Sequence, residues 1–193
     1  MSWEDLLFAI LAPVYIYIIS HLVFPPVTPT RPPRMFADIW YFKYYVRTGG
    51  IVGVLLPLAY IFWGIAQGLD DLKALQAALT HTFLLLCQIF AEIAFGRSNG
   101  FSLPARASIP IFYNTWRLFT LYSWVKTDLF QKGEASIASG LAREWVLFGS
   151  YLAIANWAFW SFNLFCFLLP IYLPRVFRQY FEAEAALSKT KHT

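Results

Sequence analysis

Long runs of apolar residues alternate with short polar stretches along this chain. Four of these runs cover residues 6–24, 49–68, 74–95 and 145–173. Each is close to or above the roughly 20 residues that an α-helix needs to cross the hydrocarbon core of a bilayer. Hydrocarbon offers no hydrogen-bond partner to a free backbone group, so we expect each run to form a complete helix. The pattern therefore predicts an all-α fold: a polytopic transmembrane helical bundle that makes a single membrane domain of residues 1–193.

A further apolar stretch, residues 101–125, is interrupted by prolines and polar residues. Pro104 and Pro110 lack the backbone N–H of a regular helix, and Arg106 lies between them. We expect the helix to break near these prolines. The stretch then forms either a broken span or a re-entrant segment. The first case gives five spans and the second gives four.

Two polar segments lie beside the apolar runs. Residues 25–47 begin with a proline-rich stretch and end with aromatic residues interleaved with Lys43 and Arg47. The first part predicts an extended linker. The second predicts an interfacial helix, because aromatic rings and basic side chains both favour the headgroup layer. Residues 175–193 alternate apolar and charged positions and predict a surface tail.

The composition supports a membrane protein. Hydrophobic residues make up 59% of the chain and charged residues 13%, whereas a typical soluble domain is about 25% charged. So few charged side chains cannot form a water-facing surface around the whole protein. Lipid must therefore cover much of its exterior. The net charge of +4 is modest, and the bases gather at the edges of the apolar runs, which argues against a nucleic-acid partner. The expected partner is the lipid bilayer, with a membrane-protein partner or a homo-oligomer as further candidates.

The distribution of Lys and Arg predicts an orientation. With five spans, nine bases lie on the side of the C-terminus and four on the other side. Cytosolic loops carry an excess of Lys and Arg, so the C-terminus is expected to face the cytosol. If residues 101–125 are re-entrant, the tail changes side and the bias becomes ten against five. The charge distribution therefore leaves the span count open.

Polar side chains inside the apolar stretches form a candidate intramembrane polar cluster. Within it, the third run contributes residues seven and four positions apart, which lie on one face of a helix. We expect Glu92 to lie inside the bundle with an arginine or histidine partner, such as Arg117 or Arg106, because an isolated carboxylate in hydrocarbon is costly. The cluster either holds helices together or forms a polar pathway or lipid-headgroup site. Its members are His81, Gln88, Glu92, Arg106, Asn114 and Arg117.

Two further patterns predict helix packing. Asn156 and Asn163 are seven residues apart on one face of the last run, and amides there usually bond to another helix. The second run contains two pairs of glycines four residues apart, which permit close approach of helices. These pairs are Gly49 with Gly53 and Gly64 with Gly68.

No pattern in the chain indicates a reaction. The sequence contains no nucleotide-binding loop and no nucleophile elbow, and its three histidines lack the spacing of metal ligands. We therefore assign no catalytic residue, metal or cofactor. The expected role is a scaffold or assembly component. The alternative is a small transporter, channel or lipid-handling protein that uses Glu92 and Arg106 or Arg117.

The last residues of the chain suggest a cellular location for the protein. Lys189 and Lys191 stand fifth and third from Thr193, which matches the dilysine form of the endoplasmic-reticulum retrieval signal. This favours the endoplasmic reticulum or an early secretory membrane. Attraction of the lysines to anionic lipid is the competing explanation. A plastid envelope is the alternative address, although the acidic start of the chain is unlike a transit peptide.

Several strings in the chain resemble a plant and green-algal family of multi-span membrane proteins that is defined only by a domain of unknown function. The resemblance covers nearly the whole chain in order. It implies a membrane protein of a photosynthetic eukaryote and carries no assigned activity. The strings are VFPP (23–26), LAYIF (58–62), FSLP (101–104), PIFYN (110–114), FNLF (162–165) and LLPIYLPRVF (168–177).

Substituting Lys191 separates the two interpretations of the tail. Lys191→Arg keeps the charge that attracts anionic lipid but changes a side chain that a coat receptor reads. In a chain tagged at the N-terminus and ending at Thr193, we expect Lys191→Arg and Lys189→Ala each to move the protein to later secretory membranes, as seen by fluorescence microscopy. If both variants stay where the unaltered protein resides, the tail is not a retrieval signal.

Overall fold

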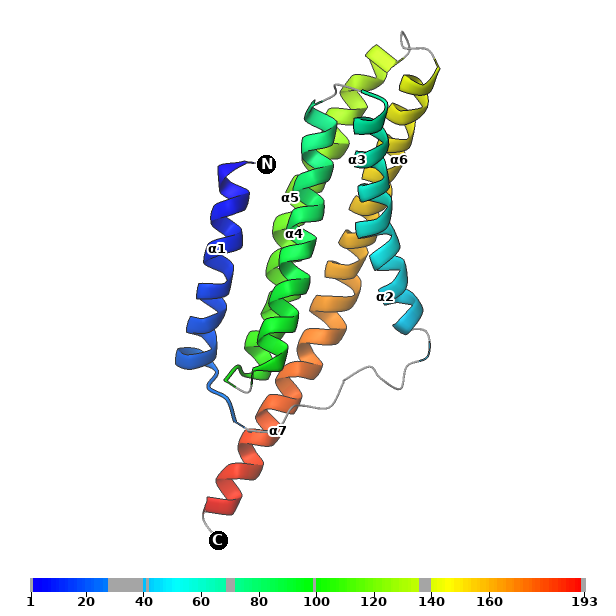
Figure 1. The fold of residues 1–193 in the computed structure, drawn as a ribbon. Helices are drawn as coiled ribbons and strands as arrows, with labels where there is room; N and C mark the ends of the chain where they lie inside the picture. The colour runs from blue at the N-terminus through cyan, green and yellow to red at the C-terminus, as the bar shows by residue number, and fades with distance from the viewer. Residues whose placement is uncertain are drawn as a thin grey trace.

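The computed structural model describes residues 2–27, 40, 42–68, 72–98, 100–135 and 140–191, and the regular structure within these ranges is entirely helical. The helices form five rods (Figure 1), in which η marks a π-helical segment. The first three rods are α1 (Trp3–Ile18) with η1 (Ile19–Val23), then α2 (Phe42–Gly50) with η2 (Ile51–Leu55) and α3 (Leu56–Ala66), and then α4 (Leu72–Arg97). The last two are α5 (Leu103–Ala135) and the continuous α6 (Leu141–Phe162), η3 (Asn163–Tyr172) and α7 (Leu173–Lys191).

Four of these rods are long and apolar enough to cross a membrane. They cover Trp3–Val23, Phe42–Ala66, Ala74–Arg97 and Arg143–Lys189. These ranges contain the four apolar runs of the sequence almost completely, so the predicted transmembrane helical bundle is confirmed. The second rod begins at Phe42, and the described part of the expected interfacial helix forms its first turns. Residues 28–39, which hold most of the expected linker, lie outside the described residues.

The predicted break near Pro104 and Pro110 is wrong, because α5 is one helix of 33 residues. Pro104 is the second residue of this helix, where a backbone N–H would have no partner in any case. Pro110 lies inside the helix, which tolerates the loss of one backbone hydrogen bond at this position. At about 1.5 Å per residue the helix is about 50 Å long, which is too long for a re-entrant segment. It runs beside α4 in the bundle (Figure 1) and packs mainly against α4 and α6.

The two terminal rods differ in how closely they join the bundle. Helix α1 lies at one edge, beside α4 and α5 (Figure 1). Most of its large apolar side chains are exposed. Helix α7 continues the line of α6 and η3 to the far end of the molecule. Its inner face is buried at Val176 and Tyr180, and the Tyr180 hydroxyl donates to the Pro25 carbonyl at 3.0 Å. The expected tail is therefore helical through Lys191.

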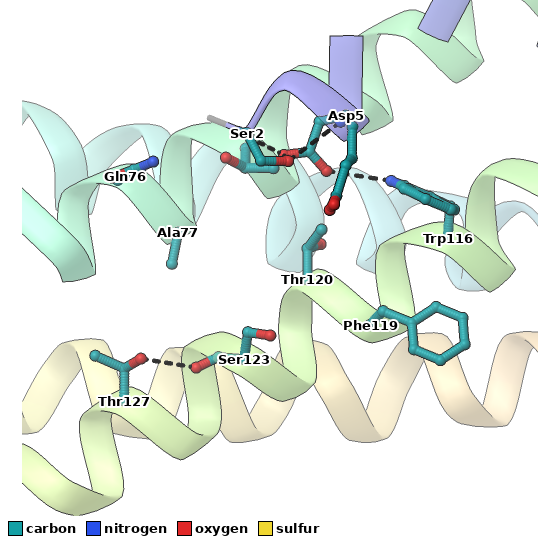
Figure 2. Close-up of a pocket in the computed structure, with 11 residues that line it drawn as sticks. Ser2, Asp5, Gln76, Ala77, Trp116, Phe119, Thr120, Ser123 and Thr127 are labelled. Atoms are coloured by element: carbon teal, nitrogen blue, oxygen red, sulfur yellow. Dashed lines mark hydrogen bonds between the residues drawn. The ribbon is translucent and has the colours of Figure 1, made fainter. Parts of the chain in front are cut away.

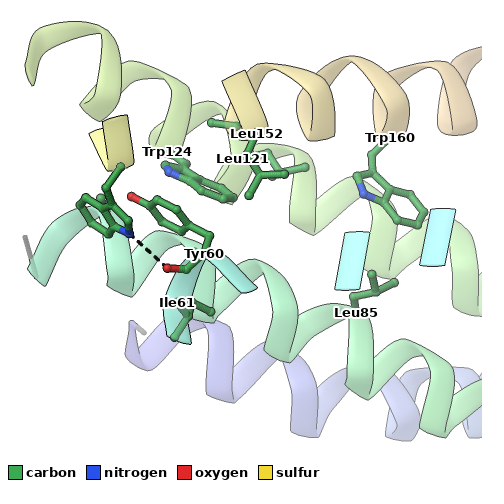
Figure 3. Packing of buried hydrophobic residues seen from close by; sticks show 11 residues of the cluster. Tyr60, Ile61, Leu85, Leu121, Trp124, Leu152 and Trp160 are labelled. Carbon is green, nitrogen blue, oxygen red and sulfur yellow. Dashed lines mark hydrogen bonds between the residues drawn. The ribbon is translucent and has the colours of Figure 1, made fainter. Parts of the chain in front are cut away.

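Aromatic side chains fill the core between α3, α4, α5 and α6 (Figure 3). The Tyr60 ring stacks on Trp145 with centroids 4.5 Å apart and planes 10° from parallel. The Trp145 indole Nε1 also donates to the Tyr60 carbonyl at 3.1 Å. Trp124 and Trp160 continue this layer along the bundle. Since lipid is as apolar as the core, close packing and such hydrogen bonds must supply the stability.

Glycines make room for this aromatic layer. A Cβ at Gly53 would lie 2.7 Å from the Trp160 ring, and one at Gly64 would lie 2.9 Å from the Trp145 ring. Gly49 faces Phe159 in the same way, at 3.3 Å. These glycines therefore face rings of α6. The fourth predicted packing residue, Gly68, instead ends the rod with a φ of +64° and has no heavy atom within 4 Å of a Cβ, so its expected packing role is wrong.

The close approach at Gly53 gives a testable prediction. Gly53→Ala places a methyl group 2.7 Å from Trp160 and 2.8 Å from Leu85, and overpacking of this kind typically costs about 1–3 kcal/mol. Gly50→Ala, three residues earlier in the same rod, meets nothing within 4 Å and should stabilise the helix by about 0.5–1 kcal/mol. Thermal unfolding in detergent, followed by tryptophan fluorescence, should give a lower midpoint for Gly53→Ala only. Equal midpoints would contradict the tight contact.

Candidate functional site

Pro57 removes one backbone donor from the second rod. A residue with an N–H at this position would bond to the carbonyl of Gly53 in an α-helix or of Val52 in a π-helix. Proline has no N–H. The Gly53 carbonyl instead accepts from His81 Nε2 at 3.1 Å, and the Val52 carbonyl accepts from Asn156 Nδ2 at 2.9 Å. Side chains of α4 and α6 thus replace the missing donor.

The His81 side chain is completely buried. Because a carbonyl can only accept, the proton of the neutral ring lies on Nε2. The Nδ1 atom has no hydrogen-bond partner among the described residues. The ring lies between Trp124 and Trp160, with centroids 6.4 and 6.5 Å away. His81 therefore joins α4 to the second rod in the middle of the bundle.

The amides of α6 and η3 extend the network along the bundle. Asn156 Oδ1 accepts from the Trp160 indole Nε1 at 3.2 Å, which fixes that ring. Asn114 of α5 donates to the Trp160 carbonyl at 3.0 Å. Farther along, Asn163 accepts from the Tyr45 hydroxyl at 2.5 Å. Asn156 and Asn163 therefore both join the last rod to the second.

Arg117 of α5 carries a charge into this network. The residue is fully buried, and its guanidinium carbon lies 4.1 Å from the centre of the Trp160 ring, a cation–π contact. Its Nη2 donates to Gln88 Oε1, and Gln88 Nε2 donates to Glu92 Oε1 at 2.8 Å. Gln88 thus stands between the two charges. Arg117 Nε and Nη1 have no hydrogen-bond partner within the described part of the chain.

The predicted direct pairing of Glu92 with an arginine is wrong, because its hydrogen-bond partner is Gln88. Glu92 is also exposed instead of enclosed in the bundle. It lies in the wall of a cavity of about 300 Å³. Arg106 lies in the same wall, and its Nη2 donates to the Ser98 carbonyl at 2.6 Å. The remaining wall residues are apolar or aromatic: Phe42, Ile109, Pro110, Phe167, Leu168 and Tyr172.

A larger cavity of about 590 Å³ lies where the start of α1 meets α4 and α5 (Figure 2). The Asp5 carboxylate closes one side of it. This carboxylate accepts from the Ser2 backbone N–H at 2.8 Å, the Ser2 hydroxyl at 2.6 Å and the Trp116 indole at 3.1 Å. Half of the other lining side chains carry hydroxyls, such as Thr80 and Thr120. Asp5 thus caps α1 and ties it to α5.

The six residues of the predicted polar cluster fall into two places. Four are buried in the central network, where they contact one another or Trp160 and the second rod: His81, Gln88, Asn114 and Arg117. Glu92 lies at the edge of this network, and Arg106 lies only in the cavity wall. The described residues contain no group of three or more potential metal ligands.

Sequence reasoning missed three residues of these sites. Trp160 stands four residues after Asn156, a spacing that puts both on one helix face. Asp5 stands three residues after Ser2, which is the spacing of a capping box. Tyr172, which lines the smaller cavity, carried no signal of its own. In α7, Lys189 is exposed, whereas the Lys191 side chain lies outside the described residues, so the retrieval signal stays a prediction.

The fold and its buried polar network are those of a polytopic α-helical membrane protein. The chain belongs to a family defined by a domain of unknown function, DUF7733, whose model matches residues 1–181. The match stops before the lysines of the tail. No curated protein and no solved structure matches the chain.

The link between Pro57 and His81 can be measured by a double-mutant cycle. His81→Ala removes the donor to the Gly53 carbonyl, and a buried group left unpaired typically costs about 1–3 kcal/mol. Pro57→Ala restores a backbone N–H that can reach the same carbonyl. We therefore expect His81→Ala to cost about 1 kcal/mol less in the Pro57→Ala background, measured as free energy of unfolding in detergent.

Thr82→Ala is the matched control for this cycle. The Thr82 side chain is also buried, but its hydroxyl donates to the Ala78 carbonyl of its own helix at 2.8 Å. Thr82→Ala should lower the free energy of unfolding by the same amount in the unaltered and the Pro57→Ala backgrounds. A His81→Ala cost that is likewise unchanged between the two backgrounds would show that the ring does not replace the proline's missing donor.

Proposed function

We propose that the protein is a non-enzymatic scaffold or assembly component of a membrane complex. The main support for this proposal is that the polar side chains at the centre of the bundle are enclosed and bonded within it. His81 and Arg117 are fully buried, and their hydrogen bonds go to other rods of the same bundle. Neither residue lines either of the two cavities described above. Polar groups used in this way hold helices in a fixed arrangement.

A transporter or channel is the rival role, and it needs a water-filled path through the bundle. Arg117 lies at the centre of the bundle, where such a path would pass. Its guanidinium instead faces the Trp160 ring and the Gln88 amide. The remaining charged residues of the predicted pathway, Glu92 and Arg106, line the smaller cavity instead. This separation favours a rigid frame over a conducting pore.

The outer surface offers large apolar side chains to lipid or to a partner in the membrane. Phe62, Phe90, Phe119 and Tyr151 are each more than two-thirds exposed. Any partner that packs here must replace lipid, so it must itself be a membrane protein or a second copy of this chain. On the basis of the resemblance and the tail lysines, we assign this assembly to the endoplasmic reticulum or an early secretory membrane of a plant or green alga, with a plastid envelope as the alternative.

Purification in a mild detergent tests the proposal. We expect native mass spectrometry of the tagged protein from its natural membrane to show a complex of fixed stoichiometry that is heavier than the 22.2 kDa chain. Glu92→Gln and Arg106→Gln should leave the number of protein subunits in the complex unchanged, because both side chains line the smaller cavity. A chain that is monomeric in every mild detergent would contradict a scaffold. Loss of a solute flux in vesicles on Glu92→Gln would instead support the transporter.

A further inference from the structure

The larger cavity, at the start of α1, is lined mainly by polar side chains. Its volume of about 590 Å³ lies within the range of small-ligand pockets, roughly 300–1,000 Å³. Figure 2 shows that α1, α4 and α5 all contribute side chains to it. Several of these side chains, including Glu4 and Gln76, are exposed, so the cavity is open to the surroundings of the protein. A ligand can therefore enter it without passing through the bundle.

The polar side chains of α4 and α5 lie on the helix faces that meet at the cavity. Thr120, Ser123 and Thr127 stand three and four residues apart, so they share one face of α5 over about 10 Å. Gln76 and Thr80 stand four residues apart on one face of α4. The cavity thus offers hydroxyl and amide groups from two sides and at several points. A ligand that bonds to all of them needs several polar atoms spread over its own surface.

Thr80 is a member of this set that lacks a partner inside the described part of the protein. Its side chain is only 4% exposed, and its hydroxyl makes no hydrogen bond with any other residue that the structure describes. Thr82 of the same helix, 3% exposed, shows the usual arrangement, because its hydroxyl donates to the Ala78 carbonyl at 2.8 Å. A buried hydroxyl without a partner is unfavourable. A ligand hydroxyl in the cavity would supply the partner that Thr80 needs.

The bonds already made inside the protein leave the cavity with more acceptors than donors. The Thr120 hydroxyl donates to the Arg117 carbonyl at 2.8 Å, and the Thr127 hydroxyl donates to the Ser123 carbonyl at 2.9 Å. Both hydroxyls therefore offer only oxygen lone pairs to a ligand, and the two carboxylates of α1 add further acceptors. Among the lining residues that the structure describes, none is a lysine or an arginine. The wall therefore repels an anion and complements a ligand that is rich in O–H donors.

The cavity lies at the level of lipid headgroups. Helix α1 with η1 is a span of 21 residues, and at 1.5 Å per residue its length of about 31 Å is close to the hydrocarbon thickness of about 30 Å. Both ends of this rod therefore lie near a surface of the bilayer, and the cavity is at its first turn. Trp3 and Lys126 are exposed at this level, as expected for residues that meet the headgroup layer.

The aromatic part of the wall is on the side nearer the bilayer centre. Helix α5 runs antiparallel to α1, because Asp5 contacts Trp116 whereas Tyr17 contacts Phe101. Trp116 and Phe119 precede the hydroxyls in α5, so they lie deeper in the bilayer. The Phe119 side chain is 67% exposed. An amphiphile with its head among the hydroxyls places its hydrocarbon chain against this ring, whereas a water-soluble ligand gains only the polar contacts.

We propose that this cavity binds the uncharged sugar headgroup of a glycolipid. A sugar ring carries several hydroxyls around its edge, and each is both a donor and an acceptor. These hydroxyls bond to the polar groups of α4 and α5, one of them to Thr80, and the acyl chains lie along Phe119. A cationic lipid is the competing ligand, because the carboxylates attract it, but a single ammonium group would leave most of the wall unbonded. The site does not depend on the scaffold role, since a bound lipid is compatible with either function class.

The test uses the full chain with a tag at the C-terminus, because a tag at the other end would lie beside the cavity. The chain is purified in a polyoxyethylene detergent, since a detergent with a sugar head, such as a maltoside, would occupy the proposed site. Lipids are then titrated and counted by native mass spectrometry. The probes are monogalactosyl diacylglycerol, monoglucosyl diacylglycerol, plain diacylglycerol, phosphatidylglycerol, a trimethylammonium diacyl lipid and the free methyl glycosides of the two sugars.

We expect one glycolipid per chain at this site. At least one of the two glycolipids should bind about tenfold or more tightly than diacylglycerol, phosphatidylglycerol and the trimethylammonium lipid, because each further hydrogen bond adds to the affinity. The free methyl glycoside of the same sugar should bind more weakly than the lipid, since it lacks the hydrocarbon chain. An added alkyl maltoside should displace the glycolipid, whereas an equal amount of polyoxyethylene detergent should not.

Substitutions on both sides of the cavity test the hydroxyl contacts. Thr80→Val keeps the shape of the side chain and removes its hydroxyl, so it should weaken the glycolipid about three- to tenfold relative to diacylglycerol. Thr80→Ser should retain the preference. Ser123→Ala removes an exposed hydroxyl of α5 and should weaken the glycolipid in the same direction, which keeps the test available if Thr80→Val does not fold. Both lipids are measured on one sample, so a general loss of folded protein cancels in the ratio.

Thr82→Val is the matched control. Its hydroxyl is buried in the same helix but bonds within that helix, and Thr82 does not line the cavity. This variant should bind every lipid as the unaltered chain does. Thr80→Val and Ser123→Ala variants that match Thr82→Val would overturn the site. A trimethylammonium lipid that binds as tightly as the glycolipids would overturn the assignment of a neutral sugar, and equal binding of the free methyl glycosides would overturn that of a lipid. These readouts are independent of the subunit number that tests the scaffold role.

Discussion

A carbonyl oxygen without a donor is costly in hydrocarbon, and Pro57 lacks the N–H that would pair the carbonyl of Gly53 or of Val52. The arrangement of the rods follows from how these oxygens are paired. His81 reaches one from α4, and Asn156 reaches the other from α6. Both side chains can reach these carbonyls only if the three rods lie at the right distances and rotations to one another. Gly53 permits this, because any side chain there would collide with Trp160.

The same demand for partners explains how the bundle holds a buried arginine. The Arg117 guanidinium lies over the Trp160 ring and bonds to the Gln88 amide, so its charge is spread over polarisable and polar neighbours. Trp160 is fixed in turn by Asn156, which also bonds to the second rod. Helix α5 can carry this residue because α4 and α6 cover it. Removing one member would leave others buried without partners.

The polar groups of the molecule thus divide by position. Those at the centre are enclosed and bond to one another, which suits a rigid frame. Those at the edge, Glu92 and Arg106, line the smaller cavity. The polar residues of one apparent cluster in the sequence therefore have different surroundings.

The sequence by itself determined the fold class, because runs of apolar residues of the right length have one solution in lipid: the helix. It also determined which residues are polar within those runs, from His81 to Asn163. Hydropathy could not identify α5 as a full-length rod, since a helix covered by its neighbours need not be apolar. Only the tertiary structure decided that Pro110 lies within a continuous helix, that Gln88 separates Glu92 from Arg117, and that Arg106 belongs to another site. These outcomes depend on the rotation and height of each rod, and contacts between rods set both.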